Sequence, residues 1–187
     1  MRAATIMALA GWAAVGGCHD HDGWDHHDTG VVYDPGSTWY YRYENGHPLA
    51  VSTTEPAILA GENALADRIN DHRVAIGEAA LIDDSALRDL ARAHSIHMAR
   101  YDFTGSVNPE HDDPGERAEK VGIPWSEFAE NIVYEHDDPD DVYHHMINSP
   151  WMHDHIDDPR FVSFGVGYEH DASSWYNDYW TVDFLEP

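Results

Sequence analysis

Apolar residues recur at helical spacing along residues 56–77. Pro56 suits the first turn of a helix, where its missing N–H leaves no bond unmade, and Gly77 is typical of a helix C-cap. The apolar positions between them are Ile58, Leu65, Ile69 and Ile76. This spacing predicts an amphipathic helix over the segment.

A second helical pattern covers residues 81–103. Asp84 or Ser85 can cap its start. Its apolar face comprises Leu87, Leu90, His94, Met98 and Tyr101. A histidine on such a face is more often a core residue bonded to the backbone than a metal ligand, so we expect His94 to be structural.

The last part of the chain changes to a period of two. Alternating apolar residues predict strands at 162–168 and 180–184, joined near residues 171–173 and paired antiparallel. A third short strand is expected at 130–134. Helices followed by strands, with a helical segment between the strands, indicate an α+β domain in layers rather than alternating βαβ units.

The pentapeptide Glu-His-Asp-Asp-Pro occurs at 110–114 and again at 135–139. Aspartate oxygens are suitable ligands for calcium. Each repeat, however, precedes a segment with helical character, and Asp followed by Pro is ordinary helix-start chemistry. We therefore interpret both repeats as helix N-caps.

The chain carries 35 Asp and Glu against 10 Lys and Arg, a formal net charge of −25. Such an acidic surface repels phosphate backbones, which excludes nucleic acid as a partner. It also excludes membrane attachment through a basic patch. The composition is that of an acidic protein whose charge keeps it dispersed.

Cys18 is the one cysteine, so no disulfide can form within the chain. Arg2 precedes an apolar run at 3–15 that is too short to span a bilayer of about 30 Å. Residues 15–18, Val-Gly-Gly-Cys, resemble the lipobox of bacterial lipoproteins, which implies cleavage before Cys18 and lipid attachment to its thiol. We therefore expect a lipoprotein signal peptide at 1–17 and a membrane anchor at Cys18, with an ordinary cleaved secretion signal as the alternative.

Residues 18–55 have the composition of a tether. The His/Asp-rich tract at 19–28 has no apolar period; such a tract can bind transition metals weakly, but a solvated spacer is the simpler interpretation. Residues 31–49 combine aromatics with Pro and Gly, which fits either a short strand pair or a segment packed on the domain. We expect the folded domain itself to occupy residues 56–187.

Six segments carry a further pattern in their order and spacing. They are 65–77, 84–103, 129–132 (Ala-Glu-Asn-Ile), 148–150 (Asn-Ser-Pro), 160–168 and 179–184. Together they resemble the CAP superfamily of cysteine-rich secretory, antigen 5 and pathogenesis-related proteins, whose bacterial members are called SCP-domain proteins. The resemblance implies an α-β-α sandwich around a small antiparallel sheet, secretion, and no obligatory disulfide in bacterial forms.

Members of this family often carry a cleft with two histidines and one or two acidic residues. The resemblance assigns the acidic position to Glu130 in Ala-Glu-Asn, whereas the Gly-Glu-Asn at 61–63 falls inside the first helix and does not correspond. The two histidine positions match Gly105 and Met152. Both imidazoles are therefore missing from their usual places.

Other histidines could replace them. His153 follows the second position by one residue, and His111 lies in a lengthened loop after the first. With Glu130 they could hold zinc, which needs nitrogen ligands about 2.0–2.1 Å away. His153 and His155 form a weaker pair for zinc or copper, provided that their stretch is extended. The expected cleft residues are Glu130, Asn131, His111, His153 and Ser149.

Functions from different classes remain open. The first is an extracytoplasmic, lipid-anchored binding or interaction module with a degenerate cleft, whose partner is a small hydrophobic ligand or an envelope component. The second is a metal-dependent hydrolase with Glu130 as general base and His111 and His153 as displaced metal ligands. The chain lacks HExxH and GxSxG motifs, which favours the first. An envelope structural protein, which needs only the anchor and the fold, is a third interpretation.

Overall fold

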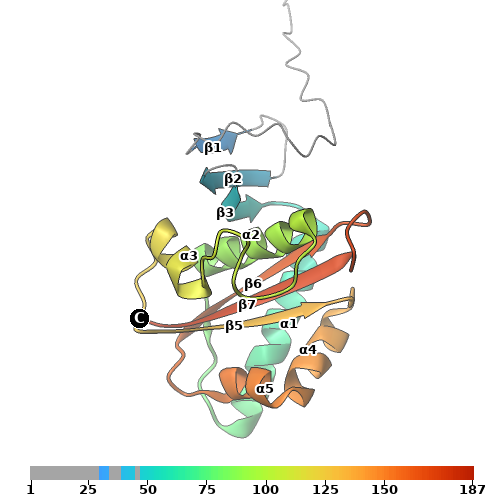
Figure 1. Cartoon of the computed structure of the whole chain (residues 1–187). Coiled ribbons are helices and arrows are strands. Elements are labelled where there is room, and N and C mark those ends of the chain that lie inside the picture. Colours follow the sequence, from blue (N-terminus) through green and yellow to red (C-terminus); the bar gives the residue numbers. More distant parts are fainter. Residues whose placement is uncertain (1–29, 34–38, 45–46) are drawn as a thin grey trace, which may run out of the picture.

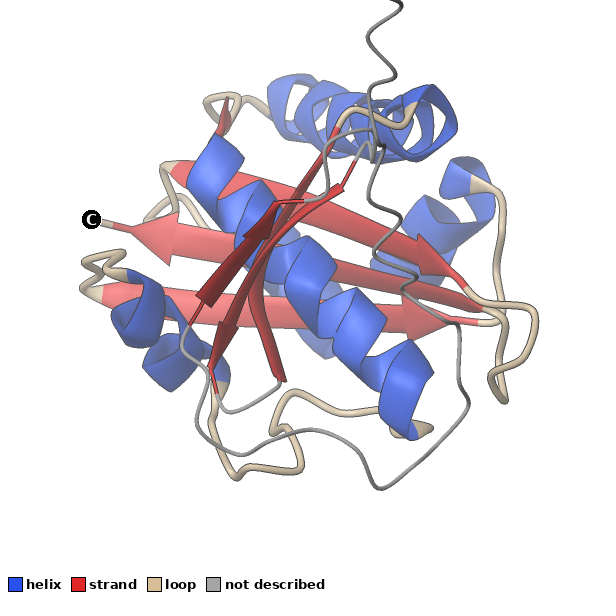
Figure 2. Cartoon of the chain, turned by 90° about the horizontal axis from the view of Figure 1, so that it is seen from above, coloured by secondary structure: helices blue, strands red, loops and turns tan. Residues whose placement is uncertain are grey.

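The computed structural model describes residues 30–33, 39–44 and 47–187. A four-stranded sheet lies between two layers of helices (Figure 1, Figure 2). One layer consists of α2 (Ser85–Tyr101) and α3 (Pro114–Val121). The other consists of α1 (Pro56–Ile76), α4 (Pro139–Asn148) and α5 (Pro150–Asp157). The predicted α-β-α sandwich is confirmed.

The sheet has the strand order β4-β6-β7-β5. These strands are β4 (Ile82–Asp83), β5 (Glu127–Tyr134), β6 (Ser163–His170) and β7 (Asp178–Glu186). β7 pairs antiparallel with both β5 and β6, which confirms the predicted terminal hairpin, while the short β4 pairs parallel with β6. The strand was expected to begin at Val162 with a buried side chain. Val162 instead precedes β6 and is 45 % exposed.

The main hydrophobic core lies between the sheet and the α1, α4 and α5 layer. The sheet contributes Phe164, Val166, Trp180, Val182 and Phe184, all at most 1 % exposed. The helices contribute, among others, Leu65, Ile69, Met146 and Ile156. Burial of this many large apolar side chains on one face is the main stabilising term of the fold.

The helix boundaries follow the capping chemistry expected from the sequence. Asp84 caps α2 through hydrogen bonds from the backbone N–H groups of Ala86 and Leu87. Asp113 caps α3 in a capping box with Glu116, and Asp138 caps α4. Both Asp-Asp-Pro repeats therefore serve as helix starts, as predicted.

Helix α2 packs directly onto β6 because that strand has glycine where it faces the helix. A Cβ at Gly165 would overlap backbone atoms of Leu87 and Arg88, and one at Gly167 would overlap those of Ala91 and Arg92. The close approach buries the middle and C-terminal part of α2, where every residue from 90 to 99 is buried. The sheet is thus covered on both faces.

The N-terminal part of the described chain forms a three-stranded antiparallel sheet of β1 (Gly30–Tyr33), β2 (Trp39–Glu44) and β3 (His47–Thr53). Strand β3 lies over α2 on the side away from the main sheet (Figure 1). Leu49 and Val51 are buried there, with Val51 against Ala93 and Ile96. The ordered domain therefore begins before residue 56, the start expected from the sequence. The signal peptide, Cys18 and the tract at 19–28 lie outside the described residues.

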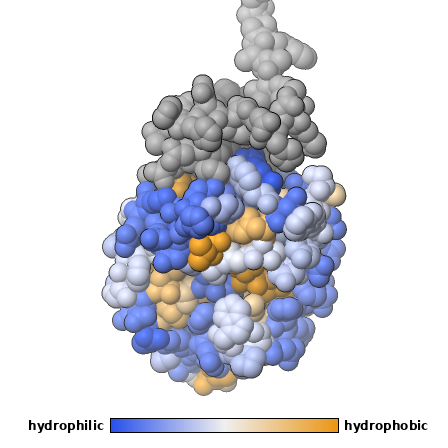
Figure 3. Space-filling view, in the orientation of Figure 1, coloured by the Kyte–Doolittle hydropathy of each residue, from blue (hydrophilic) through white to orange (hydrophobic). Residues whose placement is uncertain are grey.

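The face of the molecule seen in Figure 3 is mostly hydrophilic, with apolar side chains in small separate patches. This agrees with the charge of −25 that the sequence carries. Within the described part of the chain, no helix is both long and apolar enough to cross a bilayer.

Candidate functional site

Glu130, the acidic residue indicated by the family resemblance, lies on β5 and faces the α2 and α3 layer. The Arg117 guanidinium, from α3, donates a hydrogen bond to Glu130 Oε2. Both side chains are buried, Glu130 at 1 % exposure and Arg117 at 4 %. Arg117 also donates to the backbone oxygens of Ser106 and Asp112, so the cation is fixed from several sides. Glu130 is the anion of a buried ion pair.

Asp183 adds a second carboxyl group to this cluster. It lies on β7 opposite Glu130 in the strand register and is 1 % exposed. Burial, and then the Glu130 charge, raise the pKa of Asp183 well above its ordinary value. Burial also raises the pKa of Glu130, although the Arg117 charge opposes that rise. Because two ionised carboxylates this close would repel each other, the neighbouring Glu130 charge adds to burial in favouring the protonated form of Asp183.

His94 brings an imidazole to the same cluster from α2. Its Nε2 lies 2.9 Å from the Gly105 carbonyl oxygen, to which it donates, and 3.9 Å from Glu130 Oε1. Burial, and then the Arg117 charge, lower the pKa of His94 well below its ordinary value, so the ring is neutral. The prediction that His94 is a core residue bonded to the backbone is confirmed.

The cluster of Glu130, Arg117, Asp183 and His94 is closed and electrically balanced. Glu130 and Arg117 form an ion pair, and burial favours the neutral forms of Asp183 and His94. A general base needs a lone pair that can reach a proton of the substrate, and here the carboxylate is enclosed and bound to a guanidinium. The arrangement has the chemistry of a structural ion pair between the sheet and the α2 and α3 layer.

Sequence reasoning missed Arg117 and Asp183. Asp183 alternates with Val182 and Phe184, and a strand exposed on one face would place it in solvent. Because α2 covers that face as well, an acid at this position is buried. The burial of Asp183 could have been inferred from the predicted sandwich, because that fold covers both faces of the sheet.

The loop between α2 and α3 does not bring His111 to Glu130. His111 is exposed, has a φ of 71°, and its backbone N–H donates to Asn108 O at 2.9 Å. From the same loop, Glu110 does reach α2, and its Oε2 lies 3.3 Å from His97 Nε2.

The Asn-Ser-Pro turn begins helix α5. The extended conformation that would align His153 with His155 is therefore not observed. Residues two apart on a helix point to different sides. Met152 lies in the core at 7 % exposure. His155 turns inward, with Nδ1 2.8 Å from Asn131 Oδ1, and burial lowers its pKa. His153 turns to α1 instead, and its Nε2 lies 3.3 Å from Asp157 Oδ2.

Asn131 and Ser149 also lie apart from Glu130. Asn131 follows Glu130 on β5 and therefore faces the opposite layer, where its amide donates to Met152 O at 3.0 Å. Ser149 is the N-cap residue of α5, and its side chain accepts no capping hydrogen bond from the helix. The five expected cleft residues are distributed over both faces and a loop.

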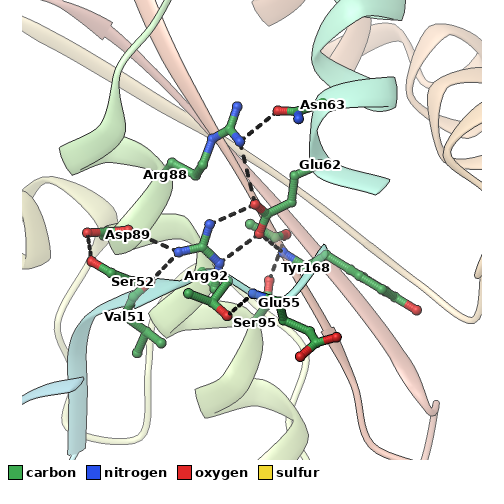
Figure 4. Close-up of polar contacts among 12 residues, drawn as sticks. Val51, Ser52, Glu55, Glu62, Asn63, Arg88, Asp89, Arg92, Ser95 and Tyr168 are labelled. Atoms are coloured by element: carbon green, nitrogen blue, oxygen red, sulfur yellow. Dashed lines mark hydrogen bonds and ion pairs between the residues drawn. The ribbon is translucent and has the colours of Figure 1, made fainter. Parts of the chain in front are cut away.

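A second buried ion pair lies where α1, α2 and β3 meet (Figure 4). Glu62, in the Gly-Glu-Asn that does not correspond to the family motif, is fully buried and accepts from Arg92 Nε at 2.8 Å and Nη2 at 2.7 Å. Arg92 also donates to Val51 O. The Glu62 carboxylate further accepts from the Tyr168 backbone N–H at 3.2 Å. This pair joins the N-terminal strand to the body of the domain.

A four-stranded sheet between two helical layers, with the Ala-Glu-Asn carboxylate buried on β5, defines the class of the protein as an α-β-α sandwich domain. Residues 66–184, more than half of the chain, match the family described as "CAP: Cysteine-rich secretory protein family". The chain belongs to this family. A search of curated proteins finds no match.

Solved structures show the same fold at low identity. An extracellular SCP-domain protein from Bacillus anthracis is 21 % identical, with a TM-score of 0.63, over 70 % of this chain and 41 % of its own. An outer surface protein from Borrelia burgdorferi is 16 % identical, with a TM-score of 0.63, over 68 % and 92 %. A cysteine-rich secretory protein from Staphylococcus aureus is 19 % identical, with a TM-score of 0.57, over 79 % and 46 %. The chain thus spans less than half the length of two of these proteins.

Proposed function

We propose that this protein is an extracytoplasmic CAP-domain binding or interaction module, anchored by lipid at Cys18, whose family cleft no longer performs chemistry. The proposed loss of catalytic activity rests on the burial and ion pairing of Glu130. This carboxylate is buried and bound to Arg117. The histidines proposed to replace the missing pair lie elsewhere, His111 in an exposed loop and His153 in the opposite layer.

The location rests on two supports. Val-Gly-Gly-Cys at 15–18 has the lipobox pattern, preceded by a short apolar run. Structural neighbours of the same fold are an extracellular protein and an outer surface protein. A surface module of this kind presents its fold to a partner, either a small hydrophobic ligand or an envelope component.

The loss of chemistry is tested by hydrolysis assays on the full chain with one equivalent of zinc. Casein and p-nitrophenyl acetate serve as general peptide and ester substrates. We expect the wild-type protein, Glu130→Gln and His111→Ala to give the same background rate. A wild-type rate that falls in both variants, while circular dichroism shows them folded, would restore the hydrolase.

The anchor is tested by expressing Cys18→Ser in a bacterial host and measuring membrane fractionation and fatty-acid labelling. We expect the variant to leave the membrane fraction and to lose the label, because the thiol is the acylation site. Gly23→Ala, in the same tract, is the matched control and should behave as the wild type. Unchanged fractionation of Cys18→Ser would contradict the anchor.

A further inference from the structure

Three potential metal ligands converge on the face of the sheet opposite Glu130. They are His72 of α1 and His153 and Asp157 of α5. One ligand atom from each lies within 4.8 Å of the others. His72 Nε2 is 2.7 Å from Asp157 Oδ1, and His153 Nε2 is 3.3 Å from Asp157 Oδ2. Each imidazole therefore approaches a different oxygen of one carboxylate.

The spacing follows from the helices. His153 and Asp157 are four residues apart, so they occupy the same side of α5. Helix α1 packs beside that side and supplies His72, whose ring centroid is 5.4 Å from that of His153. Ligands of a tetrahedral zinc ion lie about 3.3 Å from one another when each bond is about 2.0–2.1 Å. The observed separations differ from this value by amounts that side-chain rotation can supply.

Arg73 fixes the two helices relative to each other directly beside the cluster. Its side chain is buried, and its guanidinium donates to Ile156 O at 2.6 Å and to Asp158 O at 3.0 Å. It donates as well to Ala79 O at 2.8 Å, just after α1. The residues that follow His72 and flank Asp157 are thus joined through one cation. Ligands held on rigid elements keep the geometry that a metal requires.

Tyr143, from α4, orients the His72 ring. Its hydroxyl lies 3.1 Å from His72 Nδ1. Without a metal, Nε2 donates its proton to Asp157 Oδ1 and Nδ1 accepts from the tyrosine hydroxyl. When a metal replaces the Nε2 proton, the ring takes the other tautomer and Nδ1 donates to the tyrosine oxygen. Metal-binding histidines characteristically have such a partner on their second nitrogen.

We propose that His72, His153 and Asp157 form a divalent transition-metal site, with zinc as the ion. Two imidazoles and one carboxylate are a borderline ligand set suited to zinc, whereas calcium and magnesium prefer oxygen ligands alone. The side chains are 15 %, 35 % and 39 % exposed, so an ion can enter and a water can complete the coordination. The acidic surface attracts cations. The site goes beyond the proposed binding function and does not depend on it.

The test is isothermal titration of zinc into a full-length variant in which the His/Asp-rich tract at 19–28 can no longer bind metal. To remove metal binding by this tract, we would replace its four histidines with serine: His19, His21, His26 and His27. We expect one zinc per chain. His72→Gln and His153→Gln should each weaken binding at least about 100-fold, more than the roughly 10–100-fold that a second-shell loss costs. Asp157→Asn should also weaken binding, because it removes the charged oxygen that both imidazoles approach.

Two matched controls are available. His144→Ala removes an exposed histidine next to Tyr143, and His111→Ala removes the residue of the hydrolase alternative. Both should retain the parent affinity. Equal affinities in the parent, His72→Gln and His153→Gln would overturn the proposal. So would a stoichiometric site that disappears in His111→Ala, which would return zinc to the Glu130 cleft.

A second measurement reads the geometry directly. Cobalt(II), which replaces zinc in such sites, should give visible absorption typical of four-coordinate nitrogen and oxygen ligation in the parent and lose it in His153→Gln. Tyr143→Phe should weaken zinc binding by about 10–100-fold, because the imidazole loses its orienting partner. Zinc should raise the melting temperature of the parent but not of His153→Gln, since an ion that binds only the folded state stabilises it. Octahedral cobalt absorption together with unchanged melting in the parent would contradict the site.

Discussion

The two faces of the central sheet hold the same kinds of ionisable side chains in opposite conditions. Beneath α2 and α3, Glu130, Arg117 and His94 are enclosed, with at most 4 % exposure. Beside α1 and α5, His72, His153 and Asp157 are 15–39 % exposed. Burial forces the first group to neutralise itself within the protein, whereas the second can exchange protons for an ion from solvent. Residue type alone therefore does not identify a site; burial and available partners decide it.

The largest expected effect that separates the two faces comes from Arg117→Met. Loss of one partner from a buried ion pair leaves the other uncompensated, so we expect the free energy of unfolding to fall by about 3–5 kcal/mol. Urea denaturation followed by circular dichroism measures this change. The double variant Arg117→Met/Glu130→Gln should recover part of the loss, because no buried anion then remains unpaired.

Arg160→Met is the exposed counterpart. Arg160 pairs with Asp158 at 2.7 Å, but its side chain is 55 % exposed. Exposed ion pairs contribute about 0–1 kcal/mol, so the loss should stay below about 1 kcal/mol. Equal losses for the two arginine variants would remove the distinction between the faces.

Gly167→Ala should have the next largest effect. The added methyl group would overlap the backbone of Ala91 and Arg92, so α2 must move away from β6. Overpacking of this kind costs about 1–3 kcal/mol. Gly61→Ala is the control on the other layer, where the new Cβ meets the Trp180 ring at 3.2 Å; its effect should stay within about 1 kcal/mol. A thermal melt in which Gly167→Ala matches the wild type would show that the two backbones are not in contact.

The smallest expected effect is the pH dependence of Asp183→Asn. The folded-state pKa of Asp183 is raised, so between the unfolded and folded values the native state holds the extra proton. The contribution of Asp183 to the free energy of unfolding therefore falls as the pH rises above about 4. Asparagine does not titrate and has nearly the same size as aspartate. We expect the variant to gain stability relative to the wild type as the pH rises from 4 to 7.

Denaturant titrations at several pH values measure this difference. Glu169, whose pKa burial and then Asp171 raise to about 7, keeps a residual slope of the same sign in both proteins. Parallel pH profiles for the wild type and Asp183→Asn would mean that Asp183 is not the proton carrier of the cluster.

The regular elements of the fold could be predicted from the sequence. The helix expected at 56–77 is observed as Pro56–Ile76, and the one expected within 81–103 as Ser85–Tyr101. The apolar periodicity and the Asp-Pro caps are local signals, so they can be interpreted without knowledge of the rest of the fold. The order of the segments then indicated the family and its sandwich.

The partners of the site residues could not be predicted in the same way. His72 and His153 lie far apart in sequence and meet only because α1 packs beside α5. Arg117 reaches Glu130 because the α2 and α3 layer closes over β5. The local conformation of 150–157 was also ambiguous, and helix rather than extended chain decided which way His153 and His155 point. Contacts between distant segments depend on packing, which a single sequence does not record.

The Arg92 cation has a consequence for where this protein can be divided. Its two acceptors outside α2, the Glu62 carboxylate and the Val51 carbonyl, both precede residue 66, where the match to the family description begins. A fragment trimmed to that similarity would retain the guanidinium and discard both of these acceptors. A domain boundary should therefore be chosen to keep the partners of the buried Arg92 charge, and the ends of the family match are not a sufficient guide.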